Sequence, residues 1–214
     1  MIKLDNMDQF YKAYHKWLEL DTSKFWAIGT QDFAYRHVHV PLFDNITYTE
    51  ENGMPTMHMP VPATYPIGKI RAGLVCPKHS VWVIYRNFDM TVQEFLMNYL
   101  KTVHGLSEPV LSKGPSYNQN DVMINGKKVL GQIQVVRAGQ TYYGCFFNIT
   151  MDEQDKQDLV NGMKDDRNFY PDKIANISGI KDEVPGFDEN KFLGELEAYF
   201  MASGVPEFKK SEVM

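Results

Sequence analysis

A tight turn between two runs of strand-forming residues constrains the fold of this chain more than any other feature. Asn125-Gly126 accepts the positive φ angles of a type I′ hairpin turn. Branched and apolar residues flank it on both sides, and a further apolar run follows a second turn around Gly139. We therefore predict three consecutive antiparallel strands, over residues 122–124, 128–136 and 142–149.

Apolar stripes with helical spacing predict four helices, each opened by a residue that can cap free backbone N–H groups. The clearest helix follows Thr91, which has the spacing of a capping box with Glu94, and it ends at Gly105. In the other three, Asn6 with Gln9 opens a helix over residues 6–20, Thr150 with Glu153 opens one toward Gly162, and Asp188 caps the last.

Aromatic and branched residues predict further strands over residues 25–28, 33–40 and 80–85. Residues 41–71 contain five prolines, which remove backbone donors, so we expect a long loop there. The order of the elements predicts one α+β domain over residues 1–214, with a mixed sheet and helices against one face.

The composition excludes several classes of protein. Hydrophobic residues make up 43% and charged residues 23%, which is typical of a folded chain. The net charge of -5 argues against broad nucleic-acid binding, because such binding depends on Lys and Arg displacing counterions. No apolar run approaches the roughly 20 residues that cross a bilayer, and the N-terminus lacks a basic and hydrophobic leader. We expect a cytoplasmic protein without a membrane partner.

Two segments resemble one enzyme family. The stretch Asn120-Asp-Val-Met-Ile-Asn-Gly-Lys-Lys-Val-Leu-Gly-Gln-Ile-Gln134 resembles the central segment of the lipoate-protein ligases and the related biotin ligases and octanoyl transferases, where Asn-Gly-Lys-Lys-Ile-x-Gly is typical. Tyr143-Gly-Cys-Phe-Phe-Asn148 looks like the strand that follows it in that family. The resemblance covers about residues 65–202. It implies a mainly antiparallel sheet with packed helices, as in the class II aminoacyl-tRNA synthetase and biotin synthetase folds.

The resemblance implies a function for Lys128. Enzymes of this family condense a small carboxylic acid, lipoate or biotin, with ATP and magnesium, and pass the acyl group to a lysine of an acceptor protein. A fixed ammonium at Lys128 would stabilise the negative charge that develops during adenylation. Asn120, Asp121, Gly131 and Gly144 would contribute to binding. Without the resemblance, Lys128 would be a solvated hairpin lysine, and the glycines would be bulges or close strand contacts. With the functional reading, we expect Lys128 to line a cavity, and Lys128→Ala to abolish ATP-dependent acyl transfer while leaving thermal stability nearly unchanged.

The second signature of the family is altered in this chain. The family has a basic pair followed by consecutive glycines, whereas the sequence here is Gly68-Lys69-Ile-Arg71-Ala-Gly73-Leu-Val75. Gly68 and Gly73 still permit a close backbone approach to a ligand, and Lys69 and Arg71 could contact a phosphate or carboxylate. Both could equally be surface charges. The alternative function is therefore a non-catalytic module of the ligase fold that binds a ligand or a protein.

Other residue groups suggest further sites, and for each we favour a structural role. His37 and His39 share a strand face and could bind a metal with His58 or His79, but no carboxylate stands at a recognisable spacing, so no metal is predicted. Cys145 lies in an apolar run that disfavours a thiolate, and Cys76 is read as a second buried thiol. The acids of residues 152–166 are interpreted as a solvated helix face.

Overall fold

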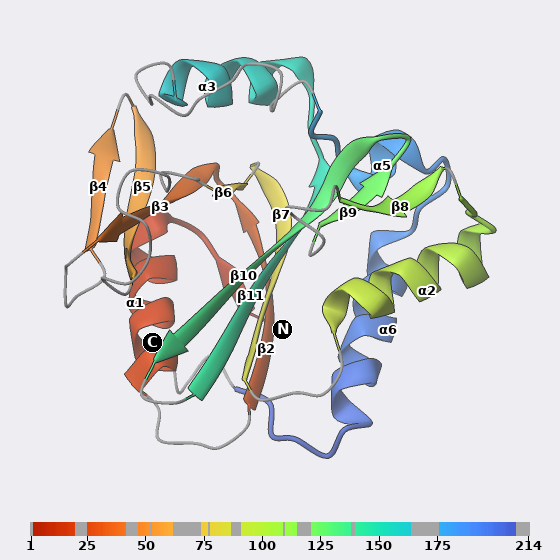
Figure 1. Cartoon of the computed structure of the whole chain (residues 1–214), viewed down its shortest axis with the longest axis horizontal. Coiled ribbons are helices and arrows are strands. Elements are labelled where there is room, and N and C mark those ends of the chain that lie inside the picture. The colour runs from red at the N-terminus through yellow and green to blue at the C-terminus, as the bar shows by residue number, and fades with distance from the viewer. Residues whose placement is uncertain are drawn as a thin grey trace.

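The computed structural model describes residues 2–19, 25–41, 47–51, 53–61, 74–76, 78–86, 91–108, 110–114, 121–137, 140–163 and 176–208. Its helices are α1 (Met7–Glu19), α2 (Val92–His104), α3 (Glu153–Met163), the short α5 (Ile180–Glu183) and α6 (Glu189–Met201). The strands form two sheets, so the molecule is an α+β structure in which strands and helices alternate irregularly along the chain (Figure 1).

The larger sheet has seven strands in the order β1-β2-β7-β11-β10-β9-β8. All neighbouring pairs are antiparallel except β1 with β2, so the sheet is mixed and mainly antiparallel. The predicted meander over 122–149 is confirmed, although its second turn, around Gly139, lies outside the described residues. The strands are β1 (Ile2–Leu4), β2 (Phe25–Asp32), β7 (His79–Arg86), β8 (Leu111–Lys113), β9 (Val122–Ile124), β10 (Lys127–Arg137) and β11 (Gln140–Thr150).

The smaller sheet corrects the prediction of a loop over residues 41–71. It contains β3 (Tyr35–Pro41), β4 (Thr47–Glu51), β5 (Met54–Val61) and β6 (Leu74–Cys76), in the order β4-β5-β3-β6.

Two prolines fit into the central strand β5 because of where they lie along it. Pro55 is paired only with β4, opposite Glu50, and Pro60 is paired only with β3, opposite Val40. Within the described residues, neither proline is paired with a strand on both sides, which is where a missing N–H would interrupt a ladder. The two prolines therefore do not prevent the sheet.

Helices cover both faces of the large sheet, which corrects the prediction of helices on one face. One core cluster joins α2 and α6 to the face that carries Trp26, Val83 and Phe147. A second cluster joins α1 to the opposite face, which carries Trp82 and Phe146, and it extends to the smaller sheet. Figure 1 shows α1 on one side of the large sheet and α2 with α6 on the other.

Side-chain caps define the helix ends, mostly as predicted. The Thr91 hydroxyl accepts from the Glu94 N–H at 3.2 Å, and Gly105 ends α2 with a φ of 66°. The prediction for α3 is corrected: Asp152 and Asp155, and not Thr150 with Glu153, accept each other's backbone N–H at 2.7 and 3.1 Å. Asn6 and Asp188 cap α1 and α6 as expected. None of the helices in the described part of the chain is long and apolar enough to span a bilayer.

Candidate functional site

A bulge in β10 determines which face of the sheet Lys128 occupies. The register against β9 shifts between Lys128 and Leu130, so Val129 is an extra residue in the strand. Val129 and Leu130 are both buried in the cluster beneath α2 and α6. Because neighbouring strand residues alternate, Lys128 and Gly131 then lie on the opposite face of the sheet.

The backbone of Lys128 is hydrogen-bonded on the side away from β9. Its N–H donates to the Asn176 carbonyl at 2.7 Å, and its own carbonyl accepts from the Ser178 N–H at 3.0 Å. The carbonyl also accepts from Asn148 Nδ2 at 3.3 Å. Lys128 forms an isolated parallel bridge with Ile177. The start of β10 is thus held between β9 and a segment near α5, which fixes the point from which the Lys128 side chain extends.

The Lys128 ammonium forms an ion pair with the carboxylate of Asp121. Nζ lies 3.0 Å from Oδ2, and the two side chains are 23% and 6% exposed. Burial raises the pKa of Asp121, while the attraction of the Lys128 ammonium opposes that shift. The Asp121 carbonyl accepts from Gln93 Nε2 of α2 and from the Gly114 N–H, both at 3.0 Å. A buried carboxylate therefore holds the ammonium in place.

Lys127 has a different environment from its neighbour. Its ammonium lies 2.6 Å from Glu183 Oε1, and Glu183 also accepts from Asn125 Nδ2 at 3.0 Å and Ser178 Oγ at 2.8 Å. Burial raises the pKa of Glu183, but the bonds from Lys127, Asn125 and Ser178 outweigh it and leave the pKa below its usual value. The turn residues Asn125 and Gly126 have φ of 51° and 75°. Glu183 thus attaches the turn to α5.

The structure brings some of the predicted site residues together. Lys128 and Asp121 are in contact, and Gly131 lies on the same sheet face as Lys128. Gly144 is placed farther along the sheet, opposite Ile133. Asn148 contacts the Lys128 carbonyl but was not predicted as a site residue; its only signal is a polar side chain within an apolar strand. Outside the described residues lie Gly68, Lys69, Arg71, Gly73 and Asn120.

Of the alternative site residues, Cys145 and His79 have described surroundings. Cys145 is buried, its thiol lies 3.3 Å from Gln132 Oε1, and burial raises its pKa well above the usual range, so it is not a thiolate. No group of three or more His, Cys, Asp or Glu side chains in the described part of the chain is arranged to hold a metal. His79 bonds Asp32 and Glu189. The side chains of His37, His39 and Cys76 lie outside the described ones.

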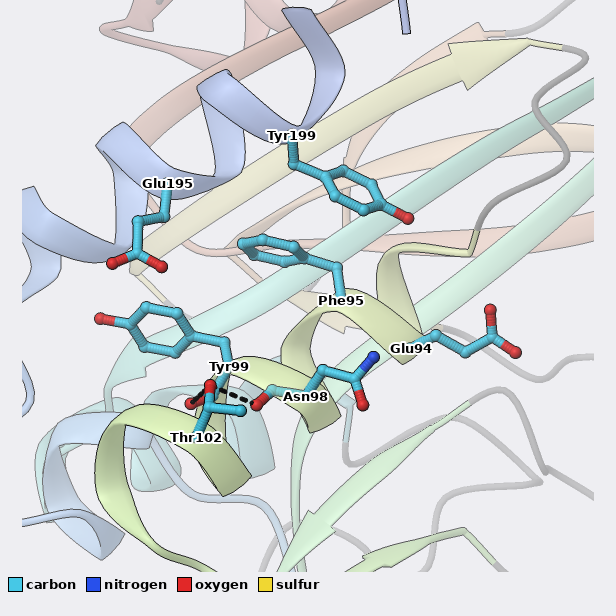
Figure 2. Close-up of a pocket in the computed structure, with 7 residues that line it drawn as sticks. All are labelled: Glu94, Phe95, Asn98, Tyr99, Thr102, Glu195 and Tyr199. Carbon is cyan, nitrogen blue, oxygen red and sulfur yellow. Dashed lines mark hydrogen bonds between the residues drawn. The ribbon is translucent and has the colours of Figure 1, made fainter. Parts of the chain in front are cut away.

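A cavity of about 360 Å³ lies away from Lys128, between α2 and α6. Phe95, Tyr99 and Tyr199 line it together with polar residues of both helices (Figure 2). These helices cover the sheet face opposite the one that carries Lys128. The cavity and the ion pair are therefore separate features.

Comparisons with known proteins identify the fold. No protein-family model matches the sequence, and no curated protein sequence matches it. Among solved structures, the chain is similar to a proposed lipoate protein ligase from T. acidophilum with bound lipoic acid, with 13% identity, a TM-score of 0.54, and 99% and 89% of the two chains covered.

Two further structures give the same result. The chain is similar to a lipoate-protein ligase A bound with ATP, with 12% identity, a TM-score of 0.55 and the same coverage of the two chains, 99% and 89%. It is also similar to a bipartite lipoate protein ligase, described with its E2 lipoyl domain, from Thermoplasma acidophilum; identity is 13%, the TM-score 0.50, and coverage 99% and 87%. The meander, the mixed sheet and these similarities together show that the chain has the fold of the lipoate-protein ligases.

Proposed function

We propose that this chain binds a small carboxylic acid of the lipoate or biotin type together with ATP and magnesium, and transfers the acyl group to a lysine of an acceptor protein. The observation that carries the proposal is the placement of Lys128, whose backbone N–H and carbonyl are both bonded to the segment before α5 and whose ammonium is held by buried Asp121. The ligase fold supports it, since similar structures are described with lipoic acid, ATP or a lipoyl domain.

The proposed reaction has two steps. In the first, a carboxylate oxygen of the acid attacks the α-phosphorus of ATP, an acyl-adenylate forms and pyrophosphate leaves. In the second, the amine of the acceptor lysine attacks the acyl carbon, AMP leaves and an amide forms. Negative charge concentrates between the carboxylate and the α-phosphate in the first step. A fixed cation stabilises charge there most effectively when it needs no reorganisation.

Lys128 supplies that cation because its geometry is set before the ligand binds. The Asp121 carboxylate holds the ammonium within 3.0 Å, and only 23% of the lysine side chain is exposed. An anionic ligand would share this ammonium with Asp121. Electrostatic stabilisation is worth more in such a partly buried setting than in water.

Magnesium would neutralise the phosphate charge, and the side chains of Asn120 and Asp121 carry oxygens of the type it prefers. The described member of this pair, Asp121, fits because its carboxylate lies beside the ammonium that would contact the α-phosphate. The segment with Gly68, Lys69, Arg71 and Gly73 would contact the nucleotide. Gly131 and Gly144 would leave room for the ligand along the sheet.

The alternative is a non-catalytic module that binds a ligand or protein. The altered glycine pattern of residues 68–75 favours it, because consecutive glycines let a backbone wrap around a phosphate. The two functions share the ligand site and differ in turnover.

Acid-dependent release of pyrophosphate from ATP tests the proposal, with lipoate, octanoate and biotin as acids. We expect Lys128→Met to lose about 100- to 1,000-fold in rate, as is usual when an electrostatic catalyst is removed. Lys113→Met is the matched control, because Lys113 is an exposed lysine on the adjacent part of the sheet. Circular dichroism must show that both variants are folded. Unchanged turnover in folded Lys128→Met would remove the lysine from the mechanism, and no turnover in the wild type would favour the binding module.

A further inference from the structure

The cavity between α2 and α6 has aromatic walls. Phe95 lies between two tyrosines, with ring centroids 4.8 Å from Tyr199 and 6.2 Å from Tyr99. Figure 2 shows Phe95 and Tyr99 extending from α2 and Tyr199 from α6. The faces of such rings carry partial negative charge, which attracts cations.

Two carboxylates line the same cavity, Glu94 from α2 and Glu195 from α6. Both glutamates are exposed, and neither forms a salt bridge with any residue in the part of the chain that the structure describes. Their negative charges affect the two tyrosines that line the cavity. Burial and then Glu94 raise the pKa of Tyr199 to about 12, and burial followed by Glu195 and Asp188 raises the pKa of Tyr99. Among the residues that line the cavity, two therefore carry a carboxylate and none carries a positive charge.

The Tyr99 hydroxyl provides an independent observation. Tyr99 is only 3% exposed, and its hydroxyl oxygen has no hydrogen-bond partner among the described residues. In Figure 2 the Tyr99 hydroxyl and the Glu195 carboxylate both lie at the left of the view, away from the Tyr199 hydroxyl. A buried hydroxyl without a partner is costly, and its oxygen can accept a bond from an N–H group.

We propose that this cavity binds an organic cation, an alkylammonium or guanidinium group on an apolar stem. The rings contact the stem and the cation, a glutamate balances the charge, and the Tyr99 oxygen accepts from a nitrogen donor. An anion would meet two carboxylates, and a neutral alcohol would gain only the apolar contact. This proposal is independent of the ligase function, because the site lies on the opposite face of the sheet from Lys128.

NMR titration of the full chain tests the proposal with n-butylammonium, n-butylguanidinium and neutral n-butanol. We expect the two cations to bind about tenfold more tightly than n-butanol, the scale expected of a cation–π contact together with a charge pair. Upfield shifts of the ligand methylene protons should report the contact with the rings. Equal affinities for the cations and for n-butanol would overturn the proposal.

Three variants locate the binding. Glu195→Gln and Tyr99→Phe should each weaken cation binding about three- to tenfold while n-butanol binding stays the same. Glu50→Gln is the control, because Glu50 is an exposed glutamate on β4, remote from α2 and α6 in Figure 1. The double variant Glu94→Gln/Glu195→Gln must lose the preference for cations, and retention of that preference would also overturn the proposal.

The source of the cation is identified by a second titration, with acetyl-Ala-Arg-Ala-amide. Tighter binding of this peptide than of n-butylguanidinium supports the site and assigns it to an arginine or lysine side chain of a partner protein. Weaker binding of the peptide than of the free cations supports the site and assigns it to a small molecule. If neither the peptide nor the free cations bind, the proposal is wrong.

Discussion

Lys127 and Lys128 are adjacent in the chain but lie in different surroundings. Lys127 joins the turn to α5 through Glu183, and Lys128 pairs with Asp121 on the face that the bulge at Val129 assigns to it. The sequence predicted the turn and selected Lys128 through a resemblance. It could not predict the two ion pairs, because Asp121 and Glu183 are acids whose positions depend on the folded sheet and on α5.

Removing Lys128 should change how stability depends on pH. The sequence alone led us to expect little change, but Asp121 is buried against the ammonium and would lose its partner. The pKa of Asp121 is already raised by burial, and it would rise further in Lys128→Met. A carboxyl group with a raised pKa stabilises the fold below its unfolded pKa, and that contribution is lost as pH rises through the folded value.

The free energy of unfolding that Lys128→Met loses should therefore be large at pH 7.5, up to about 3 kcal/mol for a broken buried pair. The loss should be smaller near pH 4.5. Urea unfolding of the wild type and the variant at both pH values measures it. In the Asp121→Asn background, the free energy of unfolding lost by adding Lys128→Met should be the same at both pH values. If Lys128→Met loses the same free energy of unfolding at both pH values, Asp121 is not the cause of the loss.

At the scale of the elements, the sequence predicted those turns and helix caps that depend only on neighbouring residues. The Asn125-Gly126 turn and the Thr91 cap have the expected geometry because each depends on residues close in sequence. The α3 cap was misassigned because Asp152 and Thr150 both offer a capping oxygen, and only the folded chain selects one. The strand β5 was missed because prolines argue against strands unless the extent of each neighbouring strand is known.

One histidine connects elements that are distant in sequence. His79 of β7 bonds Asp32 of β2 at 2.8 Å and Glu189 of α6 at 3.2 Å. Burial lowers its pKa, but the bonds to the two carboxylates outweigh burial, so the pKa of His79 lies above its usual value. A histidine with a raised pKa stabilises the fold fully below its unfolded pKa, and this contribution is lost as pH rises through the folded pKa.

Replacing this histidine should therefore cost more at acidic than at alkaline pH. We expect the free energy of unfolding lost in His79→Asn to be greatest near pH 5.5 and to decrease by pH 8.5. Paired urea titrations of the wild type and the variant at the two pH values give this difference. A loss that grows with pH would contradict the role of the protonated ring.

At the scale of the whole molecule, the large sheet separates α2 and α6 on one face from α1 on the other. The face beneath α2 and α6 carries the aromatic cavity, and the opposite face carries Lys128 and packs against α1 and the smaller sheet. Apolar stripes in the sequence predicted that α1, α2 and α6 would be buried, yet a stripe does not say which face of a sheet it meets. Topology decides that, so the sequence predicted the class of fold but placed all helices on one side.

The central claim is that Lys128 belongs to a site for an activated carboxylic acid. Calorimetry with lipoate and with a non-hydrolysable lipoyl-adenylate analogue, on the wild type and on folded Lys128→Met, tests it most directly. We expect the analogue to bind the wild type at least about 100-fold more tightly than lipoate, because a ligase must favour the adenylated state. Lys128→Met should lose most of this preference. Equal affinities for the two ligands in the wild type, or an unchanged preference in the variant, would contradict it.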